Sequence, residues 1–153
     1  MAGFQLALVD WARHGPALAA VRHAVFVIEQ GVPEQLEWDG LDPECRHAAA
    51  FAADGQVIGT GRLLPDGRIG RMAVLAAWRR RGVGAALLRL LLAEALGRGD
   101  RHIHLHAQVD AVAFYERSGF VASGADFLDA GIVHRSMSFH GDASTAVTST
   151  RQS

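Results

Sequence analysis

The chain has 153 residues, half of them apolar and 20% charged, with a formal net charge of −1. This length and composition predict one folded domain and exclude an intrinsically disordered chain. The near-neutral charge gives no reason to expect a nucleic acid or a membrane surface as partner. The only cysteine, Cys45, cannot form an internal disulfide, and no secretory signal is seen, so we expect a cytoplasmic protein.

The first half of the chain alternates between apolar runs and turn residues. Gln5–Val9 predicts a strand, and Pro16 then fits the first turn of a helix that Gly31-Val32-Pro33 ends. Residues 29–45 are predicted to form a polar loop. Three further strands are predicted, joined by the turn signals Asp54-Gly55 and Pro65-Asp66-Gly67: His47–Ala53, Gln56–Leu64 and Arg68–Leu75.

The second half alternates between helices and strands. An almost wholly apolar helix is expected from Gly82 to Leu96, and a shorter one from Asp110 to Ser118 with Asp110 as its N-cap. The other predicted elements are strands: His102–Ala107, Phe120–Ser123 and Ile132–Phe139. From residue 141 the sequence is rich in Ser, Thr and Ala without periodicity, which predicts one domain at 1–140 and a disordered tail at 141–153.

This order of elements indicates the fold class. Three antiparallel strands followed by a strand–helix–strand unit predict a single α/β (α+β) domain. Its central sheet should be mixed and mostly antiparallel, with helices on both faces. No membrane-spanning helix is expected, because the longest apolar stretch, Val83–Leu96, is interrupted by Arg89 and Glu94 and is shorter than a bilayer requires.

The segment Arg79-Arg80-Arg81-Gly82-Val83-Gly84 lies where a predicted strand leads into the apolar helix. The first N–H groups of a helix have no intrahelical partner and carry the positive end of its dipole. Glycines let the backbone approach a ligand closely, and arginines can add bidentate contacts to phosphate. The segment therefore predicts an anion site at the start of this helix.

Two other phosphate-binding patterns fit this segment poorly. A P-loop requires Gly-Lys-[Ser/Thr] at its end, whereas Ala85 follows the second glycine and the chain has no lysine. A dinucleotide-binding fingerprint requires a third glycine, and Leu87 stands in its place. A solvated basic turn before a core helix remains as the structural alternative.

Four spaced motifs resemble the GNAT N-acetyltransferase superfamily. Arg79-x-x-Gly82-x-Gly84 looks like its acetyl-CoA motif, and Ala107-Gln108 through Phe114-Tyr115-Glu116 to Gly119-Phe120 looks like the second half of that motif. Two further segments resemble the ElaA/YjcF-like branch: Val25-Phe26-Val27-x-Glu29-Gln30 and Phe127-Leu128-Asp129-Ala130-Gly131-Ile132-x-His134. The resemblance covers roughly residues 4 to 140.

The resemblance implies a set of cofactor-binding residues. The backbone of Met72, Ala73 and Val74 should pair with the pantetheine arm of acetyl-CoA, between the Arg68–Leu75 and His102–Ala107 strands. The pyrophosphate should be held by the segment from Arg79 to Ala85. The full expected set is Met72, Ala73, Val74, Arg79, Arg80, Arg81, Gly82, Val83, Gly84, Ala85 and Phe114.

The same resemblance implies roles in acyl transfer. Tyr115, the only tyrosine, matches the family's acid, and a phenol stays protonated at neutral pH and can donate to a leaving thiolate. Many family members carry an acidic base near position 70, but this chain has Gly70. The candidate bases are Glu29 and His134, ranked first, then Glu37 and His106; the alternative is that no side chain is needed. The oxyanion donor is expected to be the Val74 N–H.

Two other patterns bear on ligands. His102, His104 and His106 lie on one face of a predicted strand, but no carboxylate or cysteine joins them and family members need no metal, so none is expected. Between positions 29 and 44 there are six acids and no basic residue: Glu29, Glu34, Glu37, Asp39, Asp42 and Glu44. Such a stretch either attracts a cationic amine or is a solvated acidic loop.

The predicted function is acetyl-CoA-dependent N-acetylation of a primary amine by direct transfer. The acceptor would be a small molecule or a peptide and could be cationic. We expect no nucleic-acid or membrane partner and leave a homodimer open. The alternative is a non-catalytic acyl-CoA-binding or sensor module, which Gly70 favours and Tyr115 disfavours.

Overall fold

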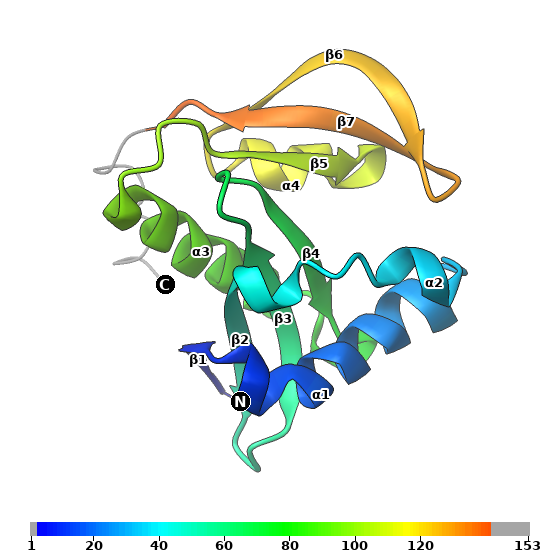
Figure 1. Ribbon diagram of the computed structural model, residues 1–153, viewed down its shortest axis with the longest axis vertical. Helices are drawn as coiled ribbons and strands as arrows, with labels where there is room; N and C mark the ends of the chain where they lie inside the picture. The colour runs from blue at the N-terminus through cyan, green and yellow to red at the C-terminus, as the bar shows by residue number, and fades with distance from the viewer. Residues whose placement is uncertain (1–2, 142–153) are drawn as a thin grey trace.

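A computed structural model describes residues 3–141. It contains two antiparallel sheets (Figure 1). The first has the order β1 (Phe4–Val9), β2 (Arg46–Ala52), β3 (Val57–Leu63), β4 (Ile69–Val74), and the second has the order β5 (His104–Gln108), β7 (Ile132–Phe139), β6 (Phe120–Asp129). The predicted α+β domain with mostly antiparallel strands is confirmed. The predicted tail lies, apart from Gly141, outside the described residues.

The N-terminal helix begins earlier than the sequence analysis predicted. Helix α1 (Trp11–Arg22) starts directly after Asp10, whose side chain accepts a hydrogen bond from the Ala12 N–H (3.2 Å). Pro16 therefore lies inside the helix and not in its first turn, because the Asp10 cap sets the start. A π-helical segment, His23–Glu29, continues α1.

The predicted polar loop at 29–45 contains two short helical segments. They are α2 (Glu34–Glu37) and a 3₁₀ turn at Asp42–Glu44. Glu37 in the first segment and Asp42 in the second form ion pairs with arginines, which helps to give this polar stretch a defined structure.

Helices cover both faces of the first sheet. Helix α3 (Val83–Arg98), which follows a 3₁₀ turn at Ala76–Trp78, packs on one face, and α1 packs on the other. A 3₁₀ turn at Val109–Ala111 precedes α4 (Val112–Glu116), so Ala111 is the N-cap in place of the predicted Asp110. Among residues 3–141, no helix is long and apolar enough to cross a membrane.

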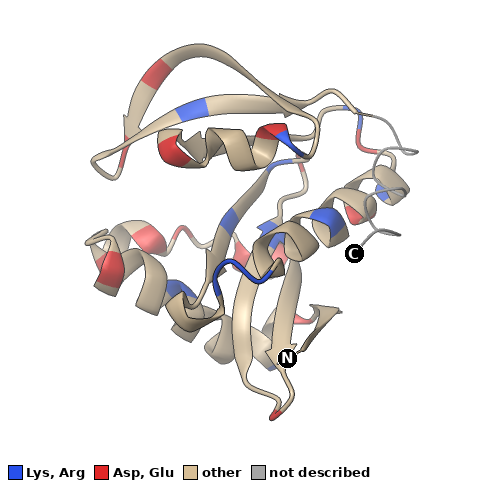
Figure 2. Ribbon diagram, turned by 180° about the vertical axis from the view of Figure 1, so that it is seen from behind, with Lys and Arg blue, Asp and Glu red and all other residues tan. Residues whose placement is uncertain are grey.

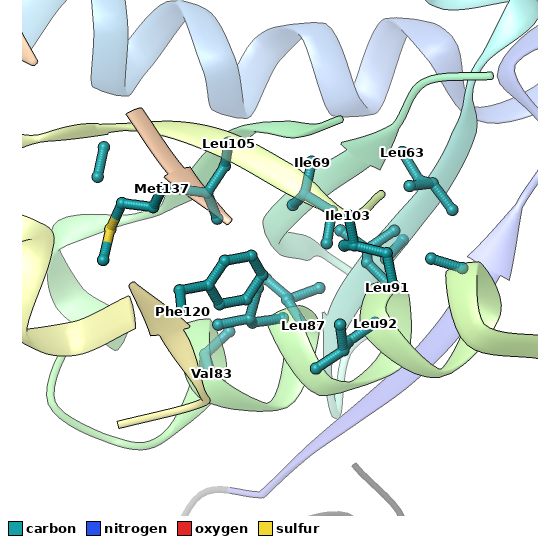
Figure 3. Close-up of a cluster of buried hydrophobic side chains, with 14 of the residues drawn as sticks. Leu63, Ile69, Val83, Leu87, Leu91, Leu92, Ile103, Leu105, Phe120 and Met137 are labelled. Atoms are coloured by element: carbon teal, nitrogen blue, oxygen red, sulfur yellow. The ribbon is translucent and has the colours of Figure 1, made fainter. Parts of the chain in front are cut away.

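The main core joins the two sheets through α3. Val83, Leu87 and Leu91 project from α3 toward Phe120 and Met137 of the second sheet, as Figure 3 shows. All five side chains are at most 2% exposed. Burial of side chains of this size stabilises a fold by about 1.5–3 kcal/mol each, so α3 fixes how the two sheets are held.

Strands β4 and β5 meet only at their first residues. Arg68, just before β4, forms an isolated parallel bridge with His104, and the His104 N–H donates to the Gly67 carbonyl (3.2 Å). Beyond this point β4 pairs only with β3, so its other edge is open. The structure therefore has two sheets joined by one bridge, where one mixed sheet was predicted, and β4 and β5 separate where the pantetheine arm is expected to lie.

A β-bulge interrupts β4. Its pairing with β3 shifts so that three steps from Gly70 to Ala73 oppose two steps from Arg62 to Thr60. Arg71 is the bulge residue, with φ of 49°, in the left-handed region that non-glycine residues rarely adopt. The extra residue lets Ile69 and Val74, five positions apart, both face the α3 core.

Candidate active site

The loop before α3 presents unpaired backbone donors. Gly82 precedes the helix with φ of 82°, and no side chain caps the helix start. The Ala86 N–H is bonded to the Gly82 carbonyl (3.0 Å), whereas the N–H groups of Val83, Gly84 and Ala85 have no acceptor among residues 3–141. Together with the positive end of the helix dipole, these groups can bind a pyrophosphate.

Arginines extend this positive site. Figure 2 shows the loop that precedes α3 as a continuous basic segment. Arg80 and Arg81 are exposed, and Arg81 stacks over the Trp78 ring at 5.1 Å from its centroid. Neither forms an ion pair with residues 3–141, so both guanidinium groups are available to phosphate oxygens.

Arg79 has a different position from its two neighbours. Its Nη1 and Nη2 donate to both carboxylate oxygens of Glu29 (2.9 and 2.7 Å), and its Nε donates to the Val74 carbonyl (2.9 Å). Arg79 therefore connects the π-helical segment to the end of β4. The hydrogen bonds from Arg79 lower the pKa of Glu29, which makes this carboxylate a weaker base.

The open edge of β4 has a donor at Val74. Its carbonyl points to this edge, where Arg79 reaches it, and the N–H and C=O of one residue point to the same side of a strand. The Val74 N–H therefore faces the edge that β5 leaves free. Ala73 pairs with Thr60 of β3, so among the predicted pantetheine contacts Met72 and Val74 present their backbone groups outward.

Phe114 and Tyr115 lie together beside this edge. A Cβ atom on Gly84 would be 3.5 Å from the Phe114 ring, so the second glycine of the loop allows close contact with α4. The Tyr115 ring packs edge-on against Phe114 and Phe120, at 5.0 and 6.1 Å between centroids. Burial raises the pKa of Tyr115 to about 12, so the phenol is protonated at any neutral pH.

A cavity of about 380 Å³ adjoins Tyr115. It lies between the π-helical segment, α2, β4, β5 and the β6–β7 turn. Its polar lining consists of Gln30, Glu37, Arg62, Arg68, Arg71, His106, Gln108, Tyr115, Asp129 and His134. Of the predicted acid and bases, Tyr115, His134, Glu37 and His106 thus meet at one cavity, and Glu29 is not part of its lining.

His134 is the cavity base with the best-defined orientation. It is 9% exposed, and its Nδ1 lies 2.7 Å from the Ile132 carbonyl oxygen. A carbonyl only accepts, so Nδ1 carries the hydrogen and Nε2 of the neutral ring keeps a lone pair. The ring also stacks on Phe127 at 5.9 Å, which fixes its plane.

His106 is a second imidazole at the cavity. Burial, and next the positive charge of Arg68, lower its pKa, so it is neutral at physiological pH. Its ring packs edge-on against Phe127 at 5.1 Å. Phe127 thus lies between the two histidines and contacts both.

Glu37 belongs to a buried ion network behind the cavity. Arg22 donates from Nε to Glu37 (2.6 Å) and from Nη1 to Asp42 (2.7 Å), and all three residues are at most 3% exposed. Arg62 in β3 bonds to Asp42 (2.9 Å) and also to Asp39. The Glu37 carboxylate is therefore already bound to a guanidinium, which makes it a less available base than His134.

The acidic stretch is largely neutralised within the fold. Four of its six carboxylates pair with arginines: Glu29 with Arg79, Glu37 with Arg22, Asp39 with Arg62, and Asp42 with Arg22 and Arg62. Only Glu34 and Glu44 have no ion-pair partner among residues 3–141. The stretch therefore presents less free negative charge to solvent than its sequence suggests.

The arginines of the cavity and its network carry no motif that marks them as site residues in the sequence. They are Arg22, Arg62, Arg68 and Arg71. A signal was present for Arg62, because an arginine among the apolar and small residues of a central strand needs a buried partner. For the histidine strand, no group of three metal-ligating side chains is found in the described part of the chain, 3–141.

Comparison with known proteins agrees with this geometry. Residues 16–140 match the family model described as "Acetyltransferase (GNAT) domain". The chain is 40% identical over 122 residues to the "Uncharacterized N-acetyltransferase YjcF" of Bacillus subtilis, covering 76% of this chain and 86% of the relative.

Solved structures show the same arrangement. An acyl-CoA N-acyltransferase from Pseudomonas aeruginosa superposes with a TM-score of 0.80 at 33% identity, covering 90% of this chain and 99% of that one. Escherichia coli ElaA superposes with a TM-score of 0.77 at 28% identity, covering 92% and 100%.

The open β4 edge, the uncapped start of α3 and the adjoining cavity define the class as an acyl-CoA-dependent transferase fold. The chain belongs to the GNAT acetyltransferase family and resembles its YjcF and ElaA members.

Proposed function

We propose that this protein transfers an acetyl group directly from acetyl-CoA to a primary amine. The observation that carries the proposal is the position of Tyr115. Its phenol lines the cavity in the same helix as Phe114, which contacts Gly84 at the phosphate-binding loop. One short helix thus connects the proposed cofactor site to the space where an acceptor can bind.

The transfer requires four groups in defined roles. The neutral amine attacks the thioester carbonyl, and the resulting oxyanion accepts a hydrogen bond from the Val74 N–H at the open edge of β4. The C–S bond then breaks, and the coenzyme A thiolate receives a proton from the Tyr115 hydroxyl. The products are the N-acetyl amine and coenzyme A, with the amine proton taken up by a base.

We assign the base role to His134, with His106 as the second candidate. Both line the cavity, and His134 presents an Nε2 lone pair because Nδ1 is bonded to the Ile132 carbonyl. Glu29 instead holds Arg79 in place, so we propose that it positions the loop before α3. A Cβ at Gly70 would have no neighbour within 4 Å, which leaves space at this position for the acceptor or a bridging water.

The test is release of free coenzyme A from acetyl-CoA in the presence of a broad amine panel. His134→Gln should lower kcat/KM by about 100-fold, because the attacking amine loses its proton acceptor. His140→Gln, at an exposed histidine outside the cavity, is the matched control and should keep the parent kcat/KM.

Two results would contradict the proposal. Binding of acetyl-CoA without release on the whole panel would favour a sensor module. An unchanged kcat/KM in His134→Gln would exclude His134 as the base and leave His106 as the candidate. A homodimer stays a prediction that size-exclusion chromatography with light scattering can test.

A further inference from the structure

One end of the cavity is lined by arginines whose charge is not fully neutralised. Arg68 is half-buried, and its guanidinium makes no hydrogen bond or ion pair with residues 3–141. Arg22 and Arg62, by contrast, are bound by buried carboxylates. Arg68 is thus a cation facing the cavity without a protein partner in the described chain.

Arg71 is held beside it by unusual backbone geometry. It is the bulge residue of β4, with φ of 49°, and its Nη2 donates to the Glu37 carbonyl oxygen (3.1 Å) and lies 3.5 Å from Asp39. Its Nε is buried and has no hydrogen-bond partner within residues 3–141, although it lies 3.6 Å from Oε1 of Glu37. A strained backbone that directs a partly satisfied guanidinium into a cavity suits a ligand that completes its hydrogen bonds.

These two arginines cannot serve the pyrophosphate of the cofactor. Arg68 precedes β4, whereas the phosphate-binding loop follows Val74 at the other end of the same strand. Six residues of extended chain span about 20 Å at roughly 3.3 Å per residue. An anion bound at Arg68 would therefore come from the other substrate and not from the pyrophosphate.

The two acidic side chains that line the cavity form no ion pair with Arg68. Glu37 is bound by Arg22 at 2.6 Å, and Asp129 is exposed at the β6–β7 turn without an ion-pair partner among residues 3–141.

We propose that the acceptor is a primary amine that also carries a carboxylate, with the carboxylate bound by Arg68 and Arg71 and the amine facing Tyr115 and His134. A guanidinium fork matches a carboxylate in a bidentate geometry, and such charge-assisted bonds are among the stronger ones in proteins. This inference rests on the proposed N-acetyltransferase function. It replaces the cationic acceptor that the acidic stretch suggested, because that stretch is mostly paired with arginines.

The experiment compares ω-amino acids of increasing chain length with their uncharged amides, with spermidine as the polycationic arm. Coenzyme A release is measured for each at saturating acetyl-CoA. For the best chain length, kcat/KM for the acid should exceed that for its amide by about 10–100-fold, the size expected of a buried charge-assisted pair. In Arg68→Gln this ratio should fall to about one, whereas Arg13→Gln, at an exposed arginine of α1, should keep it.

The outcomes separate this inference from the proposed function. Release with amides or spermidine at rates equal to or above those with the acids would overturn the carboxylate while leaving the N-acetyltransferase intact. A ratio that survives in Arg68→Gln would overturn the role of that arginine. Absence of release with every amine, despite acetyl-CoA binding, would instead contradict the proposed function itself.

Discussion

The two ends of β4 present positive charge in different ways. At its C-terminal end, the loop before α3 uses backbone N–H groups, the helix dipole and exposed arginines, all within residues 79–85. At its N-terminal end, the cavity uses side chains from segments far apart in sequence, supported by a buried ion network.

The difference has a physical basis. Backbone donors at a helix start need no partner elsewhere in the chain, so a short contiguous motif can specify them. A guanidinium inside a protein must be desolvated, and it is tolerated only where carboxylates reach it through the fold. Substitutions elsewhere in the chain should therefore affect the helix start before α3 only slightly. The cavity, by contrast, depends on the folding of the whole domain.

The largest expected effect comes from breaking the ion network. Arg22→Met removes the guanidinium that hydrogen-bonds Glu37 and one of the two that hydrogen-bond Asp42, and it should lower the free energy of unfolding by about 3–5 kcal/mol. Urea denaturation followed by circular dichroism measures the change. Glu34→Ala, an exposed acid of the same stretch, should stay within about 0.5 kcal/mol of the parent. Equal losses of unfolding free energy in Arg22→Met and Glu34→Ala would contradict a stabilising role for the buried ion network.

The next largest effect is expected for Tyr115, the proposed acid beside β4. Tyr115→Phe should lower kcat by about 100-fold, because the thiolate loses its proton donor, while acetyl-CoA affinity changes little. Initial-rate assays of coenzyme A release measure kcat, and calorimetric titration measures the affinity for acetyl-CoA. Since burial raises the pKa of Tyr115 to about 12, an alkaline loss of activity below about pH 11 should not come from this residue. An unchanged kcat in Tyr115→Phe would exclude Tyr115 as the proton donor to the thiolate.

A smaller effect is expected at the phosphate-binding loop. Gly82 has φ of 82°, so Gly82→Ala strains the loop by about 1–2 kcal/mol and should weaken acetyl-CoA binding by about tenfold. Gly97→Ala in the same helix has helical backbone and open space around its Cβ. It should leave binding unchanged and stabilise the fold by about 0.5–1 kcal/mol. Similar affinities in both variants would argue against a role for the Gly82 conformation.

The smallest expected effect is the pH dependence of the stability that the ion network contributes. Burial raises the pKa of Asp39, but hydrogen bonds from Arg62 and the Leu41 N–H outweigh it and hold the pKa well below its usual range. The unfolded state then binds a proton before the folded state does, so this stability is present above about pH 4 and is lost as pH falls further. Asp39→Asn should flatten the acid decline in melting temperature by a contribution of at most about 1 kcal/mol. An identical decline in both proteins would exclude Asp39 as its source.

The C-terminal end of β4, where the cofactor is expected to bind, was largely predictable from sequence. The strand–loop–helix order around Gly82 and Gly84, and the short helix with Phe114 and Tyr115, follow from periodicity and turn residues that lie within a few positions of one another. The start of α1 was wrong because the side-chain cap of Asp10 outweighed the preference of Pro16 for a first turn.

The cavity at the N-terminal end of β4, where we propose that the acceptor binds, could be recognised only from the tertiary structure. Arg22 and Asp42 are 20 residues apart, Arg62 and Asp39 are 23 apart, and Arg79 and Glu29 are 50 apart. No local pattern shows which carboxylate neutralises which arginine, so the sequence suggested a free acidic surface and left the cavity arginines unnoticed.

The sequence alone thus determined the family motifs and the helix start that can bind a pyrophosphate, because these depend on local backbone geometry. Only the tertiary structure decided that Glu29 holds Arg79, that His134 keeps a lone pair beside the cavity, and that Arg68 has no ion-pair partner among residues 3–141. The physical reason is that charge pairing and desolvation depend on distance in space, and the chain brings those groups together only when it folds.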